Sequence, residues 1–213
     1  IDAHPRAYGI GESEVLQKLI NAELSDQQID AWRDVSSDQL TKIATQYLNE
    51  TQEGNEQKVV VDKQLGNFQF VGMIHQLFPN AKVIHCTRNP MSMGLSCFAQ
   101  KLPPYSNPWA STLEGIGQFY SAYTSLMSHW NQCFDDVLEV PYESLVQDQE
   151  TWTNTILDFC GLPLDDQCLR FWESGRTVLT LSQDQVSKPM YTDVLQRHER
   201  FGSLLEPLRQ QLP

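Results

Sequence analysis

The chain has 213 residues, 40% of them hydrophobic, with 27 acidic and 15 basic side chains and a formal net charge of -12. This length allows one substantial hydrophobic core, and we expect a single domain over residues 1–213. The acidic balance argues against a nucleic-acid partner, because phosphate neutralisation needs a basic surface, so an anionic ligand would require a local cluster of cations.

The first predicted elements are helices. Apolar residues at positions 15, 16, 19, 20 and 24 recur with the spacing of one helix face, with Ser13 or Gly11 near its start. The polar stretch 26–50 predicts one or two short surface helices. The β-branched run KVVVD (58–62) then predicts a buried parallel strand, and a helical segment follows at 68–78.

The pattern repeats in the middle of the chain. A second buried run, KVIHCT (82–87), precedes Asn89 and Pro90, which suit an N-cap and a first-turn proline of a helix that extends to about residue 100. Strand, helix, strand and helix with short connections predict a right-handed parallel crossover. A proline-broken loop (101–111), a long helix (113–134), a third strand (136–140) and a helix around 150–162 complete an α/β pattern.

The cysteines and histidines do not predict a metal site. Five cysteines, an odd number without a C-x-x-C pair, favour buried thiols in a reducing compartment, and we expect a cytoplasmic location. His85 and Cys86 lie inside a predicted strand, which favours core packing, and His198 has no ligand-like spacing. No run of eighteen or more apolar residues occurs, so we expect no membrane partner.

Two cations follow two of the predicted strands. Lys63 comes just after the first strand and Arg88 directly after the second. Ligands of parallel sheets bind at the carboxyl ends of the strands, where these side chains would meet beside the anion-favouring start of the next helix. Ser96, on the same helix face as Ser92 and Gln100, would add a hydroxyl. The pattern predicts a phosphate or sulfate site, although a lysine or arginine at a strand end is commonly a solvated charge.

Four stretches of sequence together resemble a known family. They are VVVDKQLGNFQFVGMIHQLFPNAKVIHCTRNPMSMGLSCF, VLEVPYESLV, ILDFCGL and SQDQVSKPMY. They resemble sulfotransferases that use 3′-phosphoadenosine 5′-phosphosulfate (PAPS), above all bacterial members with tetratricopeptide repeats and the tyrosylprotein sulfotransferases. The resemblance runs from about residue 1 to 205. It implies a parallel-sheet fold like that of P-loop NTPases, with helices on both faces, and a reaction that needs no metal.

The resemblance also implies three catalytic residues. Lys63 and Ser182 match a lysine and a serine that stabilise charge at the transferring sulfuryl group. Glu12 matches the general base of the tyrosylprotein branch, which removes the proton of a hydroxyl acceptor. From the sequence alone, capping of the following helix is an equal alternative for Glu12, and Glu14 should point elsewhere.

Six residues match the family's nucleotide contacts, and these are Arg88, Ser96, Tyr142, Gln185, Lys188 and Arg197. Arg88 and Ser96 match the grip on the 3′-phosphate, which PAPS shares with its product 3′,5′-adenosine bisphosphate. Tyr142 matches an aromatic residue beside the adenine. Gln185 and Lys188 lie in a segment that resembles the loop around the nucleotide. Arg197 aligns with a further basic contact.

One part of the family's pattern is absent from this sequence. The glycine-rich loop that binds the 5′-phosphosulfate lies in relatives before the His-Pro pair found here at His4 and Pro5. We therefore expect a fold truncated at the N-terminus, as part of a longer protein or as a natural fragment. Two other functions stay open, a P-loop-type nucleotide phosphotransferase and a non-catalytic binding protein. The acceptor, whether a peptide tyrosine, a carbohydrate or a small molecule, and a homodimer are also left open.

Overall fold

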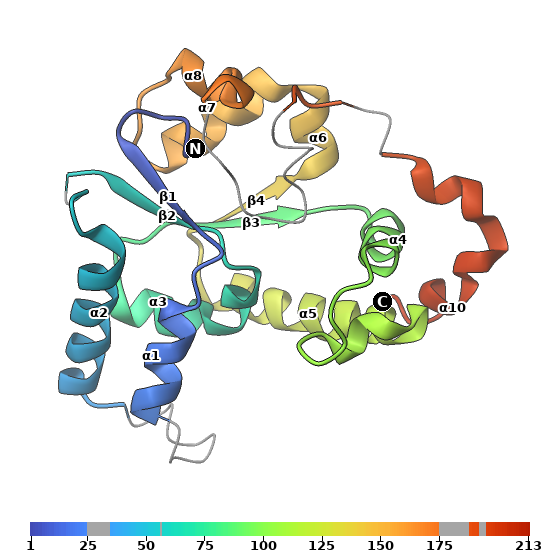
Figure 1. The fold of residues 1–213 in the computed structure, drawn as a ribbon, viewed down its shortest axis with the longest axis horizontal. Helices are drawn as coiled ribbons and strands as arrows, with labels where there is room; N and C mark the ends of the chain where they lie inside the picture. Colours follow the sequence, from blue (N-terminus) through green and yellow to red (C-terminus); the bar gives the residue numbers. More distant parts are fainter. Residues whose placement is uncertain (25–34, 56, 175–187, 192–194) are drawn as a thin grey trace. The chain divides into compact units, whose positions relative to one another are not determined.

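The computed structural model describes residues 1–24, 35–55, 57–174, 188–191 and 195–213. The chain divides into two compact units, one of residues 1–82 and 156–189 and the other of residues 83–155 and 190–213. In the described residues each unit contains one pair of parallel strands (Figure 1). Parallel pairing with intervening helices confirms the predicted α/β class.

The first pair consists of β1 (Ala7–Gly11) and β2 (Val59–Asp62). The register shifts between Gly9 and Gly11, and Gly11 has a φ of 70°, a left-handed conformation that favours glycine. The sequence predicts β2 but not β1, because glycine is depleted in strands and the segment AYGIG contains two glycines. β1 and β2 run side by side in the structure.

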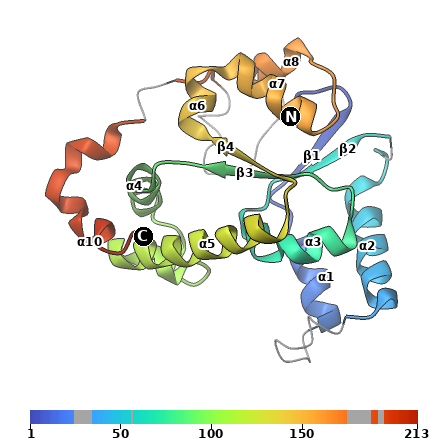
Figure 2. The same ribbon diagram turned by 180° about the vertical axis from the view of Figure 1, so that it is seen from behind.

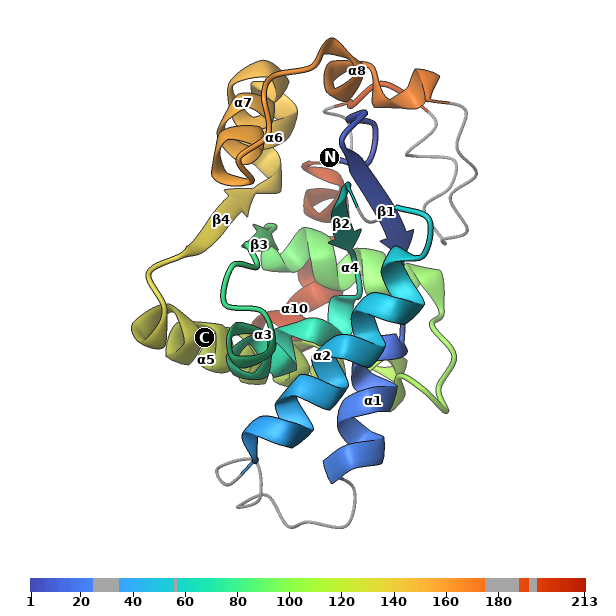
Figure 3. The ribbon, with the colours of Figure 1, turned by 90° about the vertical axis from the view of Figure 1, so that its left-hand side faces the viewer.

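Three helices pack together in this first unit. They are α1 (Val15–Leu24), α2 (Ser37–Gln52) and α3 (Val71–Leu77), the last preceded by the 3-10 turn η2 (Leu65–Phe70). Figure 3 shows α1 beside α2, whose contact buries Leu16, Ile20 and Ile43 almost completely. The predicted face of α1 is therefore confirmed. Of the one or two helices predicted for 26–50, the described residues form α2, which begins with a capping box of Ser36 and Gln39, and residues 26–34 lie outside the described part of the chain.

A second core of the first unit lies under β1. Ala7 packs with Leu157 of α7 (Gln149–Phe159), with Leu162 just after that helix and with Cys168 of α8 (Asp166–Leu169). His4 is 2% exposed and accepts the Arg6 N–H at Nδ1, so its Nε2 donates to the carbonyl of Pro163, 3.0 Å away. This histidine therefore has a structural role, joining the start of the chain to the residues after α7.

The second unit is built on β3 (Val83–Thr87) and β4 (Val137–Pro141), which pair in register from Val83 with Val137 to Thr87 with Pro141. Each is followed by a helix, α4 (Pro90–Gln100) or the short α6 (Tyr142–Gln147), and the long α5 (Leu113–Cys133) follows the 3-10 turn η3 (Pro108–Ser111) (Figure 2). These bounds confirm both predicted strands and the predicted start of α4.

The C-terminal residues belong to the core of this unit. The 3-10 segment η5 (Arg197–Leu205) and α10 (Glu206–Arg209) pack on α4, and α10 also packs on α5. Leu208 is fully buried and lies so close to Gly94 that a Cβ at position 94 would overlap its side chain. No element was predicted from the sequence for residues 197–209.

Some predicted burial is not observed. Val59 is 39% exposed and the rest of β2 is half-buried, because each described strand pairs with a single neighbour. Cys168 is buried as predicted, but Cys86 and Cys133 are exposed. Within the described ranges, no helix has the length and apolar character to cross a membrane, and no group of three or more potential ligand side chains could hold a metal ion.

Candidate active site

Glu12 and Lys63 lie together at the carboxyl ends of β1 and β2. The pairing of Gly11 with Asp62 continues for one more bond, because the N–H of Lys63 donates to the carbonyl of Gly11 over 3.0 Å. The parallel ladder therefore brings the next side chains to the same edge, and the Lys63 ammonium contacts the Glu12 carboxylate. The side chain of Glu12 is 44% exposed and that of Lys63 is 50% exposed, so both groups remain accessible to a ligand.

The cap of α1 falls to a different residue. The hydroxyl of Ser13 accepts the N–H of Val15 over 3.3 Å, while the carboxylate of Glu12 turns to Lys63. Glu14 forms an exposed ion pair with Lys18, four residues along α1, at 3.0 Å. The two neighbouring glutamates thus point to different partners, as their spacing predicted.

A half-buried carboxylate holds the turn that carries Lys63. Asp62 accepts the Tyr47 hydroxyl at 2.8 Å and the Gln64 N–H at 3.1 Å, and the side chain of Asn67 also donates to it. Burial raises the pKa of Asp62 despite these donors, and burial beside a carboxylate raises the pKa of Tyr47. Tyr47 comes from α2 and is not among the predicted site residues.

In the second unit, Arg88 and Asn89 contact two consecutive residues of α6. The guanidinium carbon of Arg88 lies 4.9 Å from the centre of the Tyr142 ring, within the range of a cation–π interaction. The N–H of Asn89 donates to the carboxylate of Glu143 over 2.9 Å. Burial raises the pKa of the Tyr142 phenol, and the charge of Arg88 opposes that shift. The end of β3 is thereby tied to the end of β4.

The start of α4 has few donors left for an anion. Asn89 is the N-cap, and its side chain accepts the N–H of Ser92 over 3.1 Å. The N–H of Met93 binds the carbonyl of Asn89, and Pro90 has no N–H. An anion at this position would therefore depend on cations and hydroxyls more than on the helix terminus.

The remaining predicted site residues are distributed as follows. Ser96 is half-buried in α4, and Arg197 and Lys188 are exposed. Ser182 and Gln185 lie outside the described residues. Lys63 belongs to one compact unit and Arg88 to the other, so the expectation that they meet at one sheet edge stays a prediction.

A contact between titratable side chains of β3 and α5 was not predicted from the sequence. Nε2 of His85 contacts the hydroxyl of Tyr123 in α5, whereas the sequence suggested only core packing for this histidine. Burial lowers the pKa of His85, and the negative charge of Glu139 partly opposes this shift. Burial is also the main reason that the pKa of Tyr123 rises to about 12. Neither side chain is among the predicted site residues.

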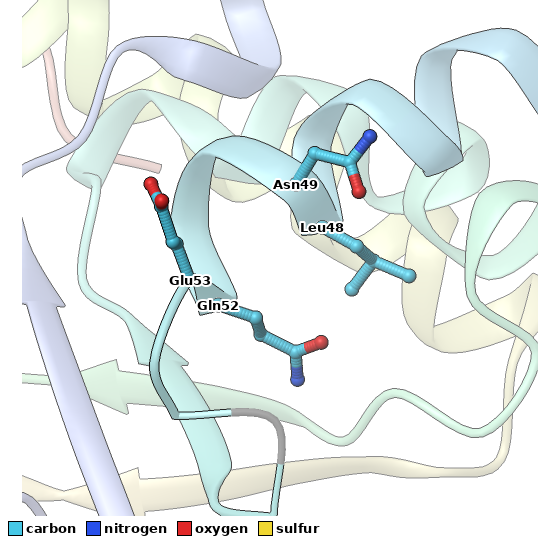
Figure 4. Close-up of a pocket in the computed structure, with 4 residues that line it drawn as sticks. All are labelled: Leu48, Asn49, Gln52 and Glu53. Carbon is cyan, nitrogen blue, oxygen red and sulfur yellow. The ribbon is translucent and has the colours of Figure 1, made fainter.

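The last turn of α2 and its C-cap residue border a pocket. Its described lining is Leu48, Asn49, Gln52 and Glu53 (Figure 4). None of these four is a predicted site residue, and their chemistry is that of an amide-rich surface with one carboxylate.

Comparisons with known proteins identify the class of this fold. The chain resembles the sulfotransferase domain of the Synechococcus PCC 7002 olefin synthase, with a TM-score of 0.61 and 22% identity over 93% of this chain and 73% of that one. It also resembles the sulfotransferase domain of the curacin biosynthetic pathway, with a TM-score of 0.54 and 16% identity over 92% and 80% of the two chains. The fold is thus the P-loop-like fold of sulfotransferase domains.

The chain belongs to the sulfotransferase family, whose sequence model matches residues 2–166. An uncharacterized protein of Aquifex aeolicus is 28% identical over 98% of this chain and 29% of its own length. Protein-tyrosine sulfotransferase 1 of Danio rerio is 29% identical over 57% of this chain and 36% of its own length. The chain therefore spans less than two-fifths of these relatives.

Proposed function

We propose that this protein transfers a sulfuryl group from PAPS to a hydroxyl acceptor. The observation that carries the proposal is the contact between the Glu12 carboxylate and the Lys63 ammonium at the carboxyl ends of paired parallel strands. Transfer of a sulfuryl group to a hydroxyl is helped by a base that removes the hydroxyl proton and by a cation that stabilises the developing negative charge. Membership of the sulfotransferase family supports the sulfuryl group as the cargo.

The proposed step gives each residue a separate task. The acceptor oxygen forms the new bond to sulfur as the bond between sulfur and the leaving phosphate oxygen breaks. The acceptor proton passes to the Glu12 carboxylate, and the Lys63 ammonium stabilises the charge that develops on the leaving phosphate. Ser182 would act at the same point as Lys63.

The second unit carries the proposed grip on the nucleotide. Arg88, held against the Tyr142 ring, and Ser96, two turns into α4, would bind the 3′-phosphate. Arg197 would add a third contact. These donors suit a phosphate, because a guanidinium and a hydroxyl both donate to its oxygens.

The decisive experiment measures which nucleotide binds. In titration calorimetry of the full-length protein, 3′,5′-adenosine bisphosphate should bind more tightly than 5′-AMP. Arg88→Ala should lower the affinity for the bisphosphate by about ten- to 150-fold, which corresponds to the loss of a hydrogen bond to a charged group. Arg209→Ala, which removes an exposed arginine paired with Glu206 in the same unit, is the matched control and should change little.

Three results would contradict the proposal. Equal affinity for 3′,5′-adenosine bisphosphate and 5′-AMP would show that the protein has no site for the 3′-phosphate. Magnesium-dependent ATP turnover would identify a phosphotransferase, and no binding of either nucleotide would indicate a non-catalytic protein. A panel of a tyrosine peptide, a carbohydrate and a small phenol, assayed with PAPS, would then identify the acceptor, and the name of the Danio rerio relative makes the peptide the first to try.

A further inference from the structure

A single buried hydroxyl joins α4 to the segment that contains Arg197. Ser92 is 4% exposed, and its Oγ lies 2.9 Å from the carbonyl oxygen of Leu195 and 2.7 Å from Nδ1 of His198. Between these two partners in the sequence lie only Gln196 and Arg197. Ser92 therefore holds both ends of a short segment whose interior carries the arginine.

The protons of this network can be assigned by counting donors. A serine hydroxyl has one proton, and a carbonyl oxygen can only accept, so Ser92 donates to Leu195. Nδ1 of His198 must then carry a proton and donate it to the Ser92 oxygen. The network is complete in this arrangement, and it requires the Nδ1–H form of the imidazole.

The place of Ser92 on α4 explains why this contact matters for the site. The N–H of Ser92 donates to the side chain of Asn89, the N-cap of α4. Ser92 therefore lies in the first turn of α4, close in sequence to Arg88. Ser96 follows one turn later on the same helix face. The segment 195–198 is thus fixed along the face of α4 that carries the proposed phosphate hydroxyl, and η5 packs on that helix.

We propose that Ser92 and His198 are positioning residues that hold Arg197 for the phosphate of the nucleotide, an inference that rests on the proposed function. An arginine side chain loses rotamer freedom when it binds a phosphate, and a fixed backbone lowers the remaining cost of binding. Loss of the Ser92 or His198 side chain therefore lowers the affinity for the nucleotide, because Arg197 is no longer held in place. The KM for the donor rises, while kcat at saturating donor stays near that of the wild type.

The test compares nucleotide affinities in a double-mutant cycle. Titration of the full-length protein with 3′,5′-adenosine bisphosphate should show about a threefold to tenfold loss for Ser92→Ala and about a tenfold loss for Arg197→Ala. In the Arg197→Ala background, Ser92→Ala should have almost no further effect. Ser121→Ala is the matched control, because that α5 hydroxyl also binds a tail carbonyl, Gln211, at 2.5 Å, and its loss should leave affinity unchanged.

Each outcome separates the positioning role from the wider proposal. Full additivity of the two losses, or an equal loss in Ser121→Ala, would overturn the positioning role alone. No preference of the wild type for the bisphosphate over 5′-AMP would overturn the proposed function and this inference together. Nitrogen-15 NMR of the unliganded protein gives an independent check, since the Nδ1–H tautomer of neutral His198 is expected and the Nε2–H tautomer would contradict the network.

Discussion

The guanidinium of Arg88 lies over the ring of Tyr142, with 4.9 Å between the guanidinium carbon and the ring centre. The family resemblance implies that this tyrosine lies beside the adenine, which stays a prediction, and in the structure its ring also contacts the arginine proposed for the 3′-phosphate. An aromatic face attracts a cation and restricts its rotamers, so Tyr142 can prepare Arg88 before a ligand arrives.

We expect Tyr142→Leu to weaken binding of 3′,5′-adenosine bisphosphate by about twofold to thirtyfold, the range of a lost cation–π contact. Tyr142→Phe keeps the ring and should bind nearly as well as the wild type. Because the effect acts through Arg88, calorimetry with 5′-AMP should show little change. An equal loss for both nucleotides would instead indicate a contact with the adenine.

Local patterns predicted much of this fold, and long-range contacts account for what they missed. The cap at Asn89 and the strand ending before Arg88 depend on neighbouring residues, and both are observed. The contact of Glu12 with Lys63 depends on pairing between distant segments through a glycine-containing strand, which no local pattern indicated. The bond of Ser92 to His198 likewise joins residues far apart in the chain.

We expect Glu12→Gln to lower kcat about 10²- to 10⁴-fold, because an amide cannot take the acceptor proton. Affinity for 3′,5′-adenosine bisphosphate should change little. The matched control is Glu14→Gln, which breaks only the exposed pair with Lys18 and should retain turnover. Similar kcat values for the two variants in a sulfuryl-transfer assay would exclude Glu12 as the base.

We expect Tyr47→Phe to lower the free energy of unfolding by about 1–3 kcal/mol, because the half-buried Asp62 carboxylate loses a donor at 2.8 Å. Urea unfolding followed by circular dichroism measures this change. Tyr105→Phe removes a hydroxyl from a residue that is 91% exposed and should stay within about 0.5 kcal/mol of the wild type. Equal stability of the two variants would show that the Tyr47 bond contributes nothing.

We expect His85 to make the folded state less stable as the pH falls. Burial lowers its pKa in the folded protein, so below about pH 6.5 the unfolded chain binds a proton that the folded chain does not. Stability should therefore fall from about pH 6.5 until the folded pKa is reached, and His85 should have no such effect above that range. Urea unfolding from pH 7.5 to 5.0 should show a smaller loss for His85→Gln.

The exposed His129 provides the control for this pH effect. His129→Gln should keep the slope of the wild type, because the His129 side chain is exposed on α5 and is not part of the half-buried contact of His85 with Tyr123. If His85→Gln and the wild type lose stability in parallel, another group causes the acid sensitivity.

The glycine at the β1 bulge gives a last prediction, one that separates stability from catalysis. Gly11 has a φ of 70°, and a Cβ there would meet nothing within 4 Å, so Gly11→Ala costs only backbone strain, about 1–2 kcal/mol. Gly54 has a φ of 75° and equally open surroundings, so Gly54→Ala should lose a similar amount. Only the first change should also lower kcat, because Glu12 follows the bulge directly. Equal turnover in the two variants, at matched losses in urea unfolding, would show that the bulge does not position Glu12.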